Sequence, residues 1–278
     1  MPAIRLQTRR VEKPWGRRDL GPPFGDVAPD GPPVGEIWFA DKAGGEAELL
    51  VKYLFTSERL SIQVHPDDTA ARAAGHPRGK SEAWIILDAA PHAQVGIGTR
   101  EVLSADELRA AALDGRIEQL LDWRAVRAGD IFYSPAGTVH ALGPGLKLIE
   151  VQQNVDLTYR LYDYGRPREL HLDEAVAVSK AVPYIAPNRV EEVEPGRARL
   201  VDGPAFVLER WTGARTAGLD AMAERPVWLV PVEGVSRVDG EEMAPGTVWL
   251  ADGPVRLELG GSADLLVASP GAEPLALG

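Results

Sequence analysis

The segment GDIFYSPAGTVH, residues 129–140, carries the clearest indication of the fold. Residues 130–134 include aromatic and β-branched side chains, which favour an extended strand. Pro135 and Gly137 then supply a turn, because proline fixes φ and glycine accepts the left-handed backbone that turns need. His140 comes shortly after these two residues. The segment therefore predicts a strand, a tight turn and a histidine just beyond the turn.

A second stretch, LSIQVHPDD at residues 60–68, also predicts a strand. Side chains alternate between the two faces of a strand, so Ser61, Gln63 and His65 point the same way. The two aspartates that follow suit turn or cap positions, and we assign them no catalytic role. One face of this strand therefore carries a hydroxyl, an amide and an imidazole.

A third stretch, KSEAW at residues 80–84, places Lys80 and Glu82 on one face if a strand begins there. Four side chains from the three stretches offer two imidazoles, one carboxylate and one amide oxygen: Gln63, His65, Glu82 and His140. This set suits a borderline divalent ion such as zinc, with open coordination left for water or substrate. A zinc ion with one carboxylate keeps a net charge of about +1 and stays a Lewis acid. We therefore predict one zinc ion per chain.

The composition is that of an ordinary globular protein, with 45% hydrophobic and 26% charged residues among 278. The chain has no cysteine, which excludes disulfides, thiolate metal ligands and a cysteine nucleophile. Only five histidines are present, so each is informative. Three of them, His76, His92 and His171, lie outside the ligand pattern, and we expect them to be structural or exposed.

The formal net charge of −11 argues against nucleic acid as a partner, because no basic run offsets it. No apolar run approaches the ~20 residues that span a bilayer, so we expect no membrane association. The sequence after Met1 shows no apolar signal-peptide core. We therefore expect a cytoplasmic protein.

Short strands separated by glycine and proline dominate the chain, which contains 29 Gly and 23 Pro. Seven strands are predicted in its first part, at 36–41, 48–55, 60–65, 82–87, 130–134, 146–152 and 158–164. A helical insertion at about 104–122 interrupts them, since Ser104 and Glu107 have the spacing of a capping box. Another short helix is predicted at 172–180.

Several prolines mark a boundary near residues 183–200, and a second strand-rich segment without histidine follows. Its strands are predicted at 205–211, 227–232, 248–251, 255–259 and 265–268. The simplest architecture is all-β, with two stacked barrels or jelly rolls. We assign residues 1–183 to a catalytic domain and residues 184–278 to a degenerate β-rich domain that lacks metal ligands.

The same stretches carry a family resemblance. GDIFYSPAGTVH matches the second signature of the cupin superfamily, except that Pro144 stands where that signature has asparagine. LSIQVHPDD, GKSEAW, GDIFYSPAGTVHALG and VQQNVDLTYRLYDYGRPRELHL resemble type I mannose-6-phosphate isomerases, especially the short bacterial branch. KPWG at residues 13–16 and GEIW at residues 35–38 match that family's opening strands. The resemblance covers about residues 10–180 and implies a cupin β-barrel.

The resemblance implies that zinc binds to Gln63, His65, Glu82 and His140. It also implies interconversion of mannose 6-phosphate and fructose 6-phosphate by proton transfer between C1 and C2 through a cis-enediol. The residues implicated in that mechanism correspond to Lys80, Glu150 and Arg160 here. Ser61 and Lys52 correspond to positions associated with the phosphate of the substrate. The expected partner is therefore a small sugar phosphate.

Elementary chemistry supports these roles. Isomerisation needs a base beside the C1–C2 bond with a pKa near neutrality. A nearby zinc ion would lower the pKa of Lys80, which could then act as this base. Glu150 is the rival candidate for the base. Arg160 cannot give up its proton and should instead stabilise enediolate oxygens.

Ordinary structural roles are the alternatives for these side chains. Glu150 could form a salt bridge with Arg160 or Lys147, because a carboxylate in an apolar run must be paired. Lys80 could be a solvated loop lysine. Lys52 could extend from the barrel towards water.

Three other functions compete with this prediction. They are an isomerase of another phosphorylated sugar, a non-catalytic cupin that binds a sugar or a metal, and an iron-dependent cupin dioxygenase. Lys80 and Arg160 argue against a binding barrel, which needs neither. Gln63 in place of a histidine argues against the dioxygenase.

Overall fold

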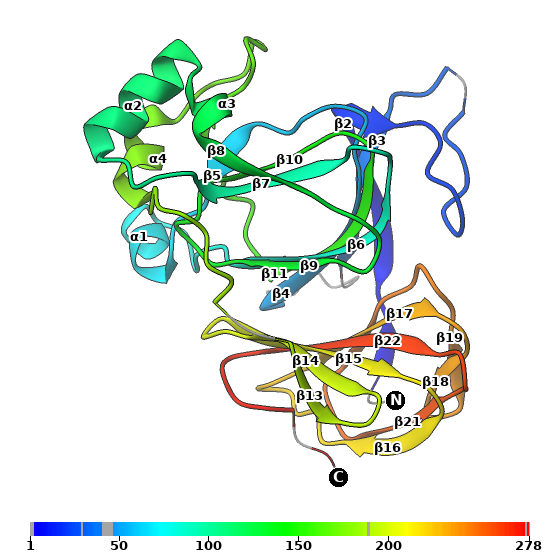
Figure 1. Ribbon diagram of the computed structural model, residues 1–278. Coiled ribbons are helices and arrows are strands. Elements are labelled where there is room, and N and C mark those ends of the chain that lie inside the picture. The colour runs from blue at the N-terminus through cyan, green and yellow to red at the C-terminus, as the bar shows by residue number, and fades with distance from the viewer. Residues whose placement is uncertain (1–2, 29, 41–46, 188–189, 276, 278) are drawn as a thin grey trace.

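The computed structural model describes residues 3–28, 30–40, 47–187, 190–275 and 277. In this part of the chain, antiparallel strands form four sheets, and short helices gather at one side of the molecule (Figure 1). The predicted all-β fold with two barrel-like parts is confirmed. No helix in the described ranges combines the length and apolar character that crossing a membrane would require.

Two sheets face each other in the first part and enclose the barrel interior (Figure 1). The first sheet has the order β2 (Gln7–Arg17), β3 (Val34–Ala40), β4 (Leu49–Phe55), β11 (Leu146–Gln153), β6 (Glu82–Ala89) and β9 (Ile131–Ser134). The second has the order β12 (Tyr159–Tyr162), β5 (Ile62–Val64), β10 (His140–Leu142), β7 (Gln94–Thr99) and β8 (Leu121–Ala125).

All seven strands predicted for this part form, with ends that shift by one or two residues. Asp41, the last residue of the first predicted strand, lies outside the described residues. The turn after β9 leads directly to His140, which opens β10 as the sequence predicted. Strands β7 and β8 were not predicted, because the glycines of β7 weaken its strand pattern.

The helices are α1 (Asp68–Ala73), α2 (Ala105–Asp114), α3 (Ile117–Leu120) and α4 (Leu172–Val178). The predicted capping box is present, because the Ser104 side chain accepts from the Glu107 amide and the Glu107 side chain accepts from the Ser104 amide. Helix α1 was not predicted. Asp67 caps it by accepting a hydrogen bond from the Ala70 amide, which is the kind of role expected for that aspartate.

The C-terminal part also consists of two sheets. The larger has the order β1 (Ala3–Arg5), β20 (Trp249–Ala251), β17 (Val227–Glu233), β22 (Asp264–Pro270), β15 (Phe206–Thr212), β14 (Arg197–Asp202) and β13 (Glu191–Glu194). The smaller has the order β16 (Arg215–Leu219), β21 (Val255–Leu259), β18 (Ser236–Val238) and β19 (Glu241–Met243). Strand β1 thus pairs with β20, far away in sequence. The division into 1–183 and 184–278 stays a prediction.

The two parts share one hydrophobic core. Alternate residues of β4 and β11 face away from the barrel interior, and Val51, Tyr53 and Ile149 belong to this outward set. They lie in the same buried cluster as Phe206 and Trp228 of the larger C-terminal sheet. Each of these five side chains is at most 2% exposed. The outer face of the barrel sheet is therefore covered by the C-terminal part.

We expect a fragment of residues 1–186 to aggregate or to be recovered only in insoluble form. Removing the C-terminal sheet would expose Val51, Tyr53 and Ile149 as one apolar patch, and it would leave β1 without a partner. Size-exclusion chromatography of the fragment beside the full chain measures this. A soluble and fully active 1–186 fragment would show that the C-terminal part is dispensable.

Candidate metal centre and active site

Three side chains of metal-ligand type meet inside the barrel. His65 follows β5 and His140 opens β10 in one sheet, while Glu82 opens β6 in the facing sheet. His65 Nε2 is 3.4 Å from Glu82 Oε2, and His140 Nε2 is 3.1 Å from Glu82 Oε1. The candidate ligand atoms all lie within 4.8 Å of one another. Tetrahedral ligands about 2.1 Å from a zinc ion would be about 3.4 Å apart, so the spacing suits one ion.

Hydrogen bonds fix the orientation of both imidazoles. Nδ1 of His65 lies 2.9 Å from the Leu157 carbonyl oxygen, and Nδ1 of His140 lies 2.9 Å from the Thr138 carbonyl oxygen. A carbonyl oxygen can only accept, so each Nδ1 carries the proton and each Nε2 presents a lone pair. Burial, followed by the charge of Lys80, lowers the pKa of His65 to about 3. His65 is therefore neutral at physiological pH, as a metal ligand must be.

Gln63 lies beside this group but presents its nitrogen to it. Its Nε2 is 3.2 Å from His140 Nε2, and its Oε1 accepts a hydrogen bond of 3.0 Å from the Ser61 hydroxyl. A metal ligand would have to offer Oε1, which a half-turn of the amide plane brings to the same place. The structure thus brings the four predicted ligands together, and Gln63 needs this rotation to serve as one.

The donor set fits a divalent cation. Glu82 Oε2 is buried without a hydrogen-bond partner, and Lys80 Nζ lies 2.9 Å from it but outside hydrogen-bond geometry. A buried carboxylate is costly unless its charge is balanced, and its two oxygens can accept more than this one ion pair. A cation between this oxygen and the two Nε2 lone pairs would remove that cost, so the residues present are those a metal site needs.

Lys80 is buried next to the ligand group. It is 6% exposed, with Nζ 3.3 Å from His65 Nε2, so the alternative of a solvated loop lysine is wrong. Burial acts to lower the pKa of Lys80, but the charges of Glu82 and Glu150 outweigh burial and raise it. A positive charge at Glu82, such as a metal ion, would lower the pKa of Lys80.

A cross-strand row of side chains forms the wall above the ligand group. The register of β3, β4, β11 and β6 places Trp38, Lys52, Glu150 and Trp84 side by side. Lys52 Nζ is 3.3 Å from Glu150 Oε1, and the Trp84 indole donates to Glu150 Oε2 at 3.1 Å. The suggested partners of Glu150 were Arg160 and Lys147, and this was wrong. Lys147 lies three residues away on the same strand and therefore faces outward.

Lys52 is 6% exposed, so the alternative of a lysine that extends into water is wrong as well. Its ammonium lies 4.6 Å from the centroid of the Trp38 ring and donates to the Gln152 side chain. The side chain therefore points into the barrel, towards the same interior as the ligand group.

Arg160 comes from β12 and lies directly opposite Gln63 of β5. Its Nε is buried without a hydrogen-bond partner. Burial, followed by the charge of Arg168, lowers the pKa of Arg160. The buried carboxylate of Asp163 holds Arg168 through two hydrogen bonds of 2.6 Å. Arg160 and Arg168 line the same pocket, so two guanidinium groups lie at this side of the site.

These side chains line one polar pocket. Its lining includes six predicted site residues: Lys52, Ser61, Gln63, Lys80, Glu150 and Arg160. Six further charged or aromatic residues line it that sequence reasoning did not assign: Lys13, Trp15, Glu36, Trp38, Asp156 and Arg168. Leu54, Leu60 and Thr158 complete the lining. Two of the unassigned residues could have been found from the sequence. Glu36 and Trp38 are two residues apart in the GEIW stretch, so both lie on one strand face.

The charges of the pocket favour an anion. Its cationic side chains are Lys13, Lys52, Lys80, Arg160 and Arg168, and its carboxylates are Glu36, Glu150 and Asp156. Five positive and three negative charges leave +2, in a chain whose formal net charge is −11. The net charge of the pocket is therefore opposite in sign to that of the whole chain. Salt at physiological concentration screens the distant surface charges more than those in the pocket, so the pocket charges dominate at a bound ligand.

The other three histidines take no part in this site. His92 is exposed with φ at 68°, and His76 is half-buried after helix α1. His171 precedes α4, where its Nδ1 accepts a hydrogen bond of 3.3 Å from the Arg160 amide. The expectation that these three are structural or exposed agrees with their positions.

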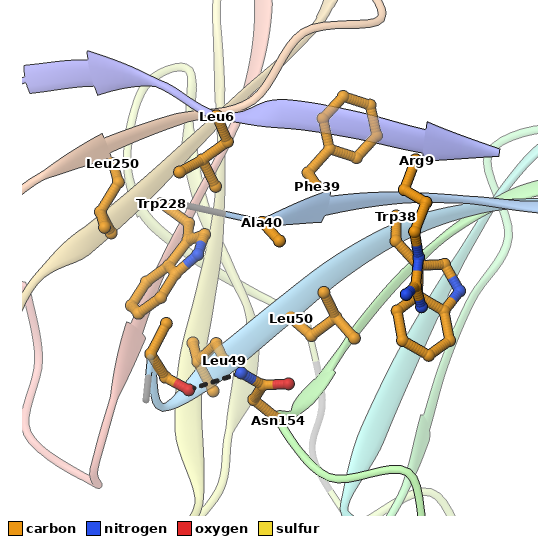
Figure 2. Close-up of a pocket in the computed structure, with 11 residues that line it drawn as sticks. Leu6, Arg9, Trp38, Phe39, Ala40, Leu49, Leu50, Asn154, Trp228 and Leu250 are labelled. Atoms are coloured by element: carbon orange, nitrogen blue, oxygen red, sulfur yellow. Dashed lines mark hydrogen bonds between the residues drawn. The ribbon is translucent and has the colours of Figure 1, made fainter. Parts of the chain in front are cut away.

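A second, mostly apolar pocket lies where the two parts of the molecule meet (Figure 2). Its apolar wall includes Leu6, Leu49, Trp228 and Leu250, and Asn154 donates to the Ala47 carbonyl at its edge. Among the described residues that line it, there is no group of ligand-type or nucleophilic side chains. The chemistry therefore belongs to the polar pocket inside the barrel.

Known proteins resemble this chain along most of its length. A scan against protein-family models finds no match. The chain is 35% identical over 231 residues to mannose-6-phosphate isomerase ManA of Bacillus subtilis (strain 168), covering 76% of this chain and 72% of that one. It is 34% identical over 200 residues to mannose-6-phosphate isomerase of Streptococcus mutans serotype c, covering 65% of this chain. The match spans only 61% of that relative's length.

Solved structures agree in fold. The crystal structure of mannose 6-phosphate isomerase from Bacillus subtilis superposes with a TM-score of 0.80 at 28% identity, covering 96% of this chain and 99% of that one. A mutant of phosphomannose isomerase from Salmonella typhimurium gives a TM-score of 0.76 at 16% identity, covering 98% of this chain and 100% of that one, which shows the fold alone. The sequence relative from Bacillus subtilis and the barrel site together lead to one conclusion: the chain belongs to the mannose-6-phosphate isomerase family.

Proposed function

We propose that the protein interconverts mannose 6-phosphate and fructose 6-phosphate with the help of one bound zinc ion. The observation that carries the proposal is the meeting of His65, Glu82 and His140 beside Lys80 in a pocket of net positive charge. Membership of the mannose-6-phosphate isomerase family supports the choice of reaction. The cytoplasm stays the expected compartment, on the sequence grounds given above.

The proposed metal ligands are Gln63, His65, Glu82 and His140. Zinc would supply Lewis acidity, which polarises the oxygens at the reacting carbons of a bound sugar. The two Nδ1 hydrogen bonds to main-chain carbonyls keep the imidazoles in the orientation that such a ligand set requires. After the half-turn that brings Gln63 Oε1 to the metal, the Ser61 hydroxyl would accept a hydrogen bond from Gln63 Nε2, in place of the one that it now donates to Oε1.

Arg160 is proposed to stabilise negative charge on the sugar during the reaction. Its Nε is buried without a partner, so an oxyanion would give that donor the hydrogen bond it lacks. Since arginine keeps its proton, its role is electrostatic. The cis-enediol needs such a donor because charge develops on its oxygens as the proton leaves carbon.

The base is either Lys80 or Glu150, and the structure supports a role for each. Lys80 Nζ lies between the ligand group and the pocket, where it can reach a substrate held at that group. The Glu150 carboxylate is held by Lys52 and Trp84, so its position is fixed as a base requires. Proton transfer between C1 and C2 needs only one group, which takes the proton from one carbon and returns it to the other.

A coupled assay tests the proposal directly. Purified protein loaded with zinc is given mannose 6-phosphate, and the formation of fructose 6-phosphate is followed. Chelated protein serves as the control and should be inactive until zinc is restored. Zinc-loaded protein that forms no fructose 6-phosphate would overturn the proposal. Turnover of a different phosphorylated sugar under the same conditions would point to the competing isomerase.

We further propose that Ser61 and Lys52 meet the phosphate group, and we expect Lys52→Ala to raise the KM for mannose 6-phosphate about ten- to a hundredfold. A lysine ~4 Å from a phosphate contributes on the order of 4 kcal/mol at an effective dielectric of about 20, before desolvation costs. Free mannose lacks this contact, so its turnover should change less. Steady-state kinetics on both sugars measures the difference.

Lys147→Ala is the matched control, because Lys147 lies on β11 but its Nζ donates to the Pro22 carbonyl outside the barrel. It should leave both KM values near those of the unchanged protein. Equal losses on both sugars in Lys52→Ala, or no loss on either, would discard the phosphate role of Lys52.

A further inference from the structure

The Lys52 ammonium is held by three different contacts. It donates a hydrogen bond of 2.6 Å to Gln152 Oε1, it lies 3.3 Å from Glu150 Oε1, and it lies 4.6 Å from the centroid of the Trp38 ring. Glu150 and Trp38 are its direct neighbours across the sheet. Gln152 is not a direct neighbour, since it faces Leu50 of β4, one pair further along the same face. The shortest of the three contacts thus comes from a diagonal position.

Gln152 can present only its oxygen to Lys52. Its Nε2 donates hydrogen bonds to two main-chain carbonyls, 2.8 Å to Gln153 and 3.1 Å to Val155. Carbonyl oxygens cannot donate, so these two bonds fix which end of the amide carries nitrogen. The side chain is 0% exposed, so no water competes for either end. The main chain just after β11 therefore aims Gln152 Oε1 at the ammonium.

The neutrality of this oxygen matters for an anionic ligand. Glu150 already supplies one negative charge to the single positive charge of Lys52. A second carboxylate at the position of Gln152 would leave the group with a net charge of −1, which repels a dianion. An amide oxygen supplies the same hydrogen bond without that charge. It can therefore direct the ammonium and leave its attraction for phosphate intact.

We propose that Gln152 is a positioning residue for recognition of the phosphorylated end of the substrate, because it holds the Lys52 ammonium in the pocket with a neutral hydrogen-bond acceptor. This inference rests on the proposed contact between Lys52 and the phosphate. Gln152 itself touches no substrate atom. Substitution of Gln152 should therefore reduce the preference of the enzyme for the phosphorylated sugar over the free sugar.

Two substitutions distinguish the loss of the hydrogen-bond acceptor for Lys52 from the addition of a negative charge beside it. Gln152→Met removes the acceptor at nearly constant length, and Gln152→Glu keeps an oxygen but adds a negative charge. Both variants also lose the two hydrogen bonds that Gln152 Nε2 donates to main-chain carbonyls. We expect the KM for mannose 6-phosphate to rise about three- to tenfold in Gln152→Met and more than about tenfold in Gln152→Glu. The kcat for mannose 6-phosphate and the kcat/KM for free mannose should stay within about threefold in both variants. Inhibition by inorganic phosphate should weaken in the same order.

The double variant Lys52→Met/Gln152→Met provides the decisive comparison. Without the ammonium there is nothing for Gln152 to direct, so the second substitution should add no further loss on mannose 6-phosphate. Additive losses, or equal losses on both sugars, would mean a purely structural role and would overturn the inference. Circular dichroism and thermal unfolding confirm that each variant is folded. If Gln152→Glu does not fold, Gln152→Met and the double variant carry the test alone.

The same set of proteins distinguishes this inference from the proposal beneath it. If Lys52→Met keeps the preference for mannose 6-phosphate over mannose, the phosphate role of Lys52 is wrong. If Lys52→Met loses that preference but Gln152→Met and Gln152→Glu keep it, the phosphate role stands and the positioning role is wrong.

Discussion

Replacing His65 or His140 by alanine is expected to remove the bound metal and the isomerase activity together. The two rings supply two of the three ligand atoms that lie within 4.8 Å of one another, and the third comes from Glu82. Each variant keeps one imidazole, one carboxylate and one amide, and so lacks the three strong ligands of a catalytic zinc site. Since a bound zinc ion would supply several kcal/mol of transition-state stabilisation, activity should fall by at least ~10³-fold when it is lost.

Metal content per chain, measured by plasma emission spectrometry, and turnover of mannose 6-phosphate check this expectation. The unchanged protein should hold about one ion per chain. His76→Ala is the control, because His76 lies after α1 and outside the ligand group. Full metal occupancy in both His65→Ala and His140→Ala would refute the assignment of the metal centre.

Lys80→Met and Arg160→Ala are expected to lose turnover while they keep the metal. Lys80 lies next to the ligand group and Arg160 opposite Gln63, but an ammonium and a guanidinium do not ligate a cation. Loss of a general base costs about 10²- to 10⁴-fold in kcat, and loss of an oxyanion donor costs about 10²- to 10³-fold. Metal analysis and steady-state kinetics on the same preparations separate this result from loss of the ion.

Glu150→Gln decides which side chain is the base. If Glu150 abstracts the proton, this variant should lose exchange of the C2 proton of mannose 6-phosphate with deuterated water. If Lys80 does so, exchange should persist in Glu150→Gln and vanish in Lys80→Met. Near-normal turnover in Lys80→Met or Arg160→Ala would show that the role given to that residue is wrong.

The strand pattern and the residue types of the site could be predicted from the sequence. Alternation along LSIQVHPDD placed Ser61, Gln63 and His65 on one face, and the structure brings the first two into a hydrogen bond. The turn after β9 delivers His140 to the same group. These features depend on local rules, since the direction of a side chain within a strand and the conformation of a Pro-x-Gly turn need few distant contacts.

The partners of the buried charges could not be predicted in this way. Glu150 pairs with Lys52 and not with Arg160 or Lys147, because β11 lies next to β4 in a register that sets these two side chains opposite each other. The attachment of β1 to β20, at the far end of the chain, follows from the same kind of pairing. Neither arrangement leaves a local pattern in the sequence.

Residue types and strand alternation, both readable from the amino-acid sequence, establish which chemical groups are available and which strand face carries them. Which of those groups touch depends on how the strands pair, as the diagonal contact between Gln152 and Lys52 shows. Strand alternation is set by the backbone of each residue, whereas register is set by the packing of strands that can lie as far apart in the sequence as Ala3 and Ala251. A shift of one residue in register would turn every side chain of a strand to its other face and separate these groups.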